Sequence, residues 1–83
     1  MKQWLFEPQV ALEIARFLLG RPTPEQIVAF HPSAEATDRF YALIDAERAG
    51  TITDDERAEL DSCINLEHMM RLIKAEVHLV LQL

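Results

Sequence analysis

Residues 63–80 read CINLEHMMRLIKAEVHLV, and this stretch decides the fold. Apolar side chains recur in it at alternating spacings of three and four, the heptad pattern of a helix that packs against other helices. The members of this heptad seam are Cys63, Leu66, Met70, Ile73, Val77 and Val80. A second apolar row widens the stripe and consists of Met69, Leu72, Leu79 and Leu83. The sequence therefore predicts a C-terminal helix with a broad apolar surface.

The start of this helix is marked by Thr53-Asp54-Asp55-Glu56. Thr53 is a helix cap, Glu56 stands three residues later to complete a capping box, and the acids suit the positive end of the helix dipole. After Asp54 the chain contains neither Gly nor Pro. The helix is therefore expected to run nearly to Leu83, over about 42 Å at 1.5 Å per residue.

Pro and Gly divide the preceding chain into three more helices. A helix over residues 8–19 begins at Pro8, whose missing N–H costs nothing in a first turn, and stops at Gly20. A short helix follows Thr23, which forms a capping box with Gln26, and ends by residue 31.

The third predicted helix runs over residues 34–49, between Ser33 as its cap and Gly50 in the left-handed conformation. On its outer face Glu35 and Arg39 stand four residues apart, a spacing at which opposite charges pair. Because residues 34–49 and 54–83 are joined by a short turn, they are expected to form a helical hairpin on which the two N-terminal helices pack.

The 83 residues allow a single domain over 1–83, and 49% of them are hydrophobic, which is ample for a core. The net charge of −6 makes direct nucleic-acid binding unfavourable. No apolar run approaches a membrane span or a secretory signal, and a single cysteine indicates a cytoplasmic location. Trp4, Leu5 and Phe6 are expected to pack on the bundle as a lid.

The apolar stripe of the last helix is too long for one short partner helix to cover. Residues 34–49 are expected to cover its first half, so the remainder from Met69 needs either the N-terminal helices or a second copy of the chain. We expect a homo-oligomer, with a dimer favoured. The predicted interface consists of Leu66, Met69, Met70, Ile73, Val77 and Val80.

An alternative function comes from residues 45–56, whose spacing resembles a calcium-binding EF-hand loop. Ala49 supplies no oxygen at the fifth loop position, and the capping of two helices accounts for the same residues without metal. The ion would be held by Asp45, Glu47, Thr51, Thr53 and Glu56.

No catalytic machinery is apparent in the sequence. It contains no Ser-centred elbow, Gly-rich phosphate loop or CxxC pair, and His31, His68 and His78 do not have the spacing of a ligand set. Cys63 falls within the heptad seam and is expected to be a buried thiol. We therefore predict a non-enzymatic protein with no cofactor.

Two stretches carry a family resemblance over residues 10 to 76. They are PTPEQI at 22–27 and LEHMMRLIKA at 66–75. With them the chain resembles a family of small bacterial all-helical proteins of unassigned function. The resemblance implies that the chain binds a partner protein, as an antitoxin does. That partner would be a basic toxin that meets the acidic face formed by the carboxylates between Asp54 and Asp61. The predicted function is thus a protein–protein interaction module that self-associates through its C-terminal helix.

Overall fold

Helices account for most of the described part of the chain. The computed structural model describes residues 8–83, in which four helices and no strand occur. They are α1 (Gln9–Leu19), α2 (Pro24–Ala29), α3 (Ala34–Ala49) and α4 (Asp54–Leu81). The predicted all-α class and the long last helix are confirmed. The prediction for Trp4, Leu5 and Phe6 lies outside the described residues.

The helix boundaries follow the capping residues. The side chains of Thr23 and Thr53 each close a capping box, at the start of α2 and of α4 respectively. Ser33 Oγ accepts the backbone N–H of Ala36 at the start of α3. Gly50 ends α3 with φ of 74°, and its N–H donates to carbonyls of the last turn. These interactions satisfy backbone groups that a helix end leaves without partners.

The end of α1 is built differently from the end of α3. Gly20 follows the helix with φ of −75°, and the left-handed conformation is taken instead by Arg21, with φ of 54°. The N–H of Arg21 donates to the carbonyl of Leu18. The helix stops where the glycine predicts, but the strained backbone falls on the next residue.

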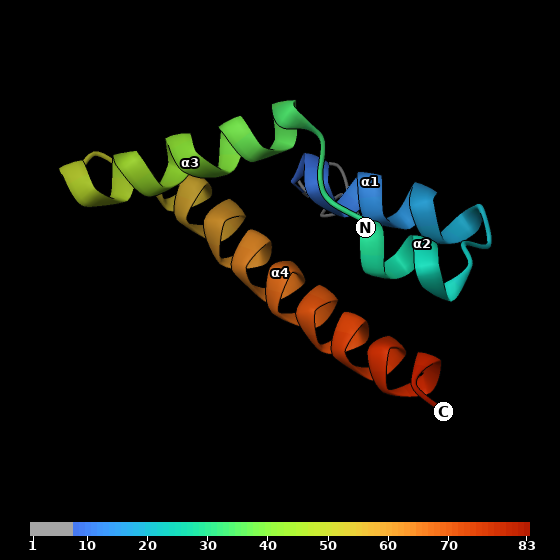
Figure 1. Ribbon diagram of the computed structural model, residues 1–83. Coiled ribbons are helices and arrows are strands. Elements are labelled where there is room, and N and C mark those ends of the chain that lie inside the picture. Colours follow the sequence, from blue (N-terminus) through green and yellow to red (C-terminus); the bar gives the residue numbers. More distant parts are fainter. Residues whose placement is uncertain (1–7) are drawn as a thin grey trace.

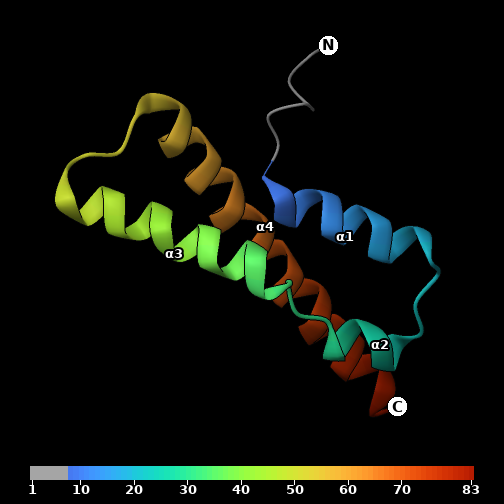
Figure 2. The same ribbon diagram turned by 90° about the horizontal axis from the view of Figure 1, so that it is seen from above.

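The three shorter helices all lie on one side of α4, and none of them covers its other side (Figure 1). Seen from above, α3 lies beside the first half of α4 at an angle to it, and α2 lies over the last turns of α4 (Figure 2). α1 lies beside α2 and also contacts α4. The second half of α4 is therefore covered on one side by the two N-terminal helices.

The most buried side chains lie where α3 meets α4. Leu43 and Leu60 are each 1% exposed, and Cys63 is buried beside them. Burying a leucine side chain stabilises a fold by roughly 1.5–3 kcal/mol. Partly buried apolar side chains complete this core from α1, α3 and the turn between α3 and α4, namely Val10, Phe40, Ile44 and Ile52.

Two contacts hold α1 against its neighbours. The carboxylate of Glu13 accepts the backbone N–H of Ser33 at 2.8 Å and its hydroxyl at 2.6 Å. The rings of Phe17 and Phe30 lie 4.6 Å apart between centroids, which joins α1 to the end of α2. Because Ser33 also caps α3, the first of these contacts joins α1 to the start of α3 at one residue.

The predicted ion pair between Glu35 and Arg39 is wrong. Arg39 donates two hydrogen bonds to Glu59 of α4, at 2.9 and 2.7 Å. A two-point guanidinium–carboxylate contact is better aligned than a single ion pair along one helix, because each of two parallel N–H groups points at its own carboxylate oxygen. The bond to Glu59 raises the pKa of Arg39.

Candidate functional sites on the long helix

The heptad seam of α4 faces the chain's own helices from Cys63 to Val77. Met70 is 8% exposed, and Leu66, Ile73 and Val77 are partly buried. Met69 and Val80, which belong to the same predicted interface, are instead exposed by 52% and 60%. The structure thus divides the predicted interface residues: those nearest Met70 face the N-terminal helices, and those at the edge face solvent.

A second apolar surface lies on the opposite side of α4. Leu79 follows Met70 by nine residues, which at about 100° per residue places it half a turn away. Leu72 is 52% exposed and lies on the same side. We call this surface the outer face of α4, and its large apolar members are Ile64, Met69, Leu72, Leu79 and Val80.

Three polar side chains interrupt the outer face near its centre. Asn65 is exposed and stands seven residues before Leu72. His68 and Glu76 are exposed and stand four residues before and four residues after Leu72. Neither His68 nor Glu76 makes a side-chain hydrogen bond or ion pair to residues 8–83. The outer face therefore has a leucine at its centre, with one imidazole and one carboxylate at equal distances along the helix.

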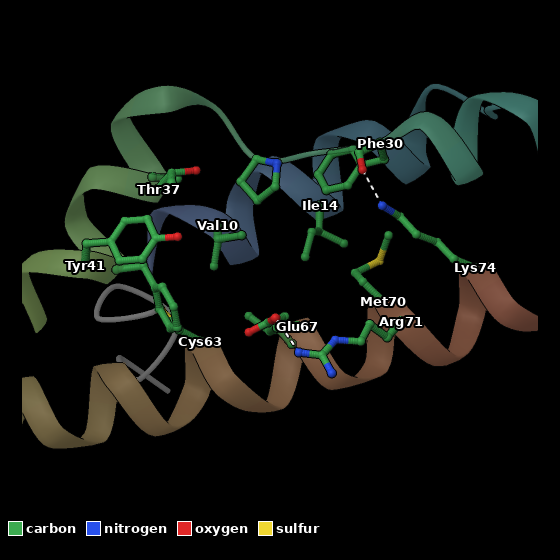
Figure 3. A pocket seen from close by; sticks show the side chains of 14 residues that line it. Val10, Ile14, Phe30, Thr37, Tyr41, Cys63, Glu67, Met70, Arg71 and Lys74 are labelled. Atoms are coloured by element: carbon green, nitrogen blue, oxygen red, sulfur yellow. Dashed lines mark hydrogen bonds and ion pairs between the residues drawn. The ribbon is translucent and has the colours of Figure 1, made fainter. Parts of the chain in front are cut away.

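The inner side of α4 borders a cavity of about 330 Å³ (Figure 3). It is lined by Val10 and Ile14 of α1, by Phe40 and Tyr41 of α3, and by Phe30 and Pro32 of the segment that joins α2 to α3. The wall from α4 contains the apolar residues Cys63, Leu66 and Met70. Sequence reasoning missed this cavity, because it depends on how four separate segments meet.

Charged groups occur at one end of the cavity. Lys74 is partly buried, and its ammonium donates to the backbone carbonyl of Phe30. Arg71 also borders the cavity and pairs with Glu67 at 2.7 Å. Cys63 lies toward the other end, where burial raises the pKa of its thiol and keeps it protonated (Figure 3). The cavity is thus apolar toward Cys63, and its other end holds the ammonium of Lys74 beside the ion pair of Arg71 with Glu67, which also lines the cavity.

The residues of the calcium-loop alternative serve the turn between α3 and α4. Glu56 accepts the backbone N–H of Thr53 at 2.9 Å, and this bond lowers the pKa of Glu56. Glu47 pairs with Arg57 at 3.2 Å, and the hydroxyl of Thr51 donates to the carbonyl of Ala46. Asp45 is exposed on α3.

Metal-binding groups do not gather elsewhere in the described residues. Residues 8–83 contain no cluster of three or more His, Cys, Asp or Glu side chains arranged to hold a metal ion. His31 bonds the carbonyl of Pro32, far along the chain from His68 and His78 of α4. Helix capping and ion pairing account for the contacts at residues 45–56.

Comparison of the chain with protein-family models, curated protein sequences and solved structures finds no match. The family resemblance of its two sequence stretches stays a prediction. Within residues 8–83, no helix is long and apolar enough to pass through a membrane.

Proposed function

We propose that this protein is a non-catalytic interaction module that self-associates through the outer face of α4. One observation carries the proposal: α4 has apolar side chains both on the side covered by α1, α2 and α3 and on the side that faces solvent. A helix that is apolar on opposite sides is typically buried on both. Its uncovered side is an extended apolar patch of the kind that marks an interface.

A second copy of the chain fits this face in one particular register. If two α4 helices run antiparallel with Leu72 on the two-fold axis, residues whose numbers add to 144 lie opposite each other. Leu72 then meets Leu72 at the axis. The imidazole of His68 then lies level with the carboxylate of Glu76 of the second copy, so these two groups can pair, whereas the amide of Asn65 lies level with Leu79.

Other antiparallel registers fit the charges less well. An axis at Glu76 would place two carboxylates against each other, which is unfavourable in a closely packed interface. An axis at residue 74 would place Glu76 against Leu72 and leave the carboxylate without a partner in an apolar contact. The charged side chains of the face therefore favour the axis at Leu72, although this register also places the neutral amide of Asn65 level with Leu79.

Sedimentation velocity of the full chain tests the proposal. At micromolar concentration the wild type is expected to sediment as a dimer and Leu72→Asp as a folded monomer, because two buried carboxylates would meet at the axis. Leu19→Asp is the matched control, since Leu19 is 82% exposed on α1 and lies outside the outer face. A wild type that remains monomeric at about 100 μM, a concentration well above the dissociation constant of a stable dimer, would contradict the proposal.

The register has its own test in a charge exchange. His68→Glu alone places glutamates opposite each other and is expected to weaken the dimer about tenfold or more, from the cost of close like charges. Adding Glu76→Lys restores opposite charges and is expected to recover the dimer. If the double variant dissociates as readily as His68→Glu, then the axis is not at Leu72, although self-association through the outer face still stands.

A further inference from the structure

The cavity on the inner side of α4 has the size and lining of a ligand site. Its volume of about 330 Å³ falls within the range of about 300–1,000 Å³ that small-molecule sites occupy. The walls are mostly aliphatic and aromatic, and they include the buried side chains of Ile14, Cys63 and Met70. The cavity lies across α4 from the outer face, so it is independent of the proposed self-association.

Lys74 gives the cavity a chemical preference. Its ammonium is partly buried, and within residues 8–83 it has no carboxylate within ion-pair distance. The bond to the Phe30 carbonyl uses one of its three N–H donors. A cation removed from water beside apolar walls is stabilised by an anion that can bind it directly. Glu67 does not supply this anion, because it pairs with Arg71.

The apolar part of the cavity extends away from this cation along α4. Cys63 and Lys74 are separated along the helix by about 16 Å, at 1.5 Å per residue. Between them the walls present Leu66 and Met70 on α4 and Val10 and Ile14 on α1 (Figure 3). A ligand with an extended apolar chain and one terminal negative charge matches this cavity, because the charge can meet Lys74 and the chain can lie along the apolar walls toward Cys63.

We propose that the cavity binds an unbranched aliphatic monocarboxylate, whose carboxylate pairs with Lys74 and whose chain lies along the wall toward Cys63. Arg71 stands at the same end and adds a guanidinium contact when the carboxylate is bound. The other described cations lie outside the cavity lining, so the contact with a carboxylate is specific to this end.

Isothermal titration calorimetry with decanoate tests this site in the full chain. The wild type is expected to show saturable binding of one decanoate per chain. Decyltrimethylammonium has a similar chain and the opposite charge, and it is expected not to bind. Lys74→Met keeps the aliphatic stem and removes the charge, and it is expected to weaken decanoate binding at least tenfold, whereas Lys74→Arg stays within about threefold.

Three further variants test whether binding depends on the cavity and on nothing else in the chain. Ala36→Phe fills the cavity and is expected to abolish binding. Arg48→Met removes a cation of α3 that does not line the cavity, and Leu72→Asp changes the outer face, so both are expected to bind decanoate as the wild type does. Absence of saturable heat, equal binding of the two probes, or wild-type affinity in Lys74→Met would each overturn the proposal.

Discussion

Ser33 links helix capping to tertiary structure. Its hydroxyl accepts the N–H of Ala36 and so caps α3, while the same hydroxyl and the backbone N–H of Ser33 donate to Glu13 of α1. The capping side chain of α3 therefore bonds a neighbouring helix as well as its own helix end. The geometry of α1 and α3 at this point therefore depends on one serine and one carboxylate.

Removing the Ser33 hydroxyl is expected to destabilise the protein by about 1–2 kcal/mol. The cap alone is worth about 1 kcal/mol, and the bond to Glu13 adds a smaller amount because it is partly solvated. Thermal unfolding of Ser33→Ala should show a midpoint lower by about 4–16 °C for a domain of this size. Ser33→Thr keeps the hydroxyl and should lose much less, so an equal loss in both variants would contradict this role.

The same contact makes stability depend on pH. The backbone N–H of Ser33, followed by its hydroxyl, lowers the pKa of Glu13 below the ordinary value of 4.5. The carboxylate form is therefore favoured in the folded state. The resulting stability is present above pH 4.5 and is lost as pH falls through the lower folded-state pKa.

Urea unfolding at pH 7 and at pH 3 measures this contribution. The wild type is expected to lose more stability than Glu13→Gln between the two pH values, since the amide cannot be protonated in this range. Asp38→Asn is the matched control, because Asp38 is exposed and makes no side-chain bond within residues 8–83. A pH dependence unchanged in Glu13→Gln would show that Ser33 does not stabilise the carboxylate.

Helix ends are the elements that the sequence predicts best. Thr23, Ser33, Thr53 and Gly50 all cap helices where their residue types indicate, because capping depends on groups within four residues of one another. Partners distant in sequence were not predictable in this way. Arg39 has an acid four residues away at Glu35, yet the packing of α3 on α4 brings it to Glu59.

The turn between α3 and α4 depends on the backbone of Gly50. Its φ of 74° lies in the left-handed region, and a Cβ placed there would meet no atom within 4 Å. Gly50→Ala is therefore expected to lose about 1 kcal/mol from backbone strain alone, without a steric clash. The thermal midpoint of Gly50→Asn should lie between those of the wild type and Gly50→Ala, since Asn tolerates the left-handed conformation better than Ala does. A Gly50→Ala variant as stable as the wild type would show that residue 50 does not need the left-handed conformation.

At the scale of the whole molecule, α4 separates two surfaces of different character. The inner side contains the cavity with Lys74 at one end, and the outer face contains Leu72 between His68 and Glu76. The heptad pattern predicted an apolar helix but not which apolar residues face the chain's own helices, because both rows have helical spacing. Met70 was placed in the predicted dimer interface, and in the folded chain it is buried at the cavity wall instead.

If the outer face joins two chains, the stability of the protein depends on its concentration. A tenfold increase in concentration is expected to raise the thermal midpoint by about 3–6 °C, because dissociation accompanies unfolding. Leu72→Asp should remain helical by circular dichroism and show no such dependence. Ile44→Val is the matched control within the core. It should reduce the free energy of unfolding by about 0.5–1.5 kcal/mol and so lower the midpoint at every concentration, while the dependence of the midpoint on concentration stays that of the wild type. A wild-type midpoint that is independent of concentration would contradict self-association through the outer face of α4.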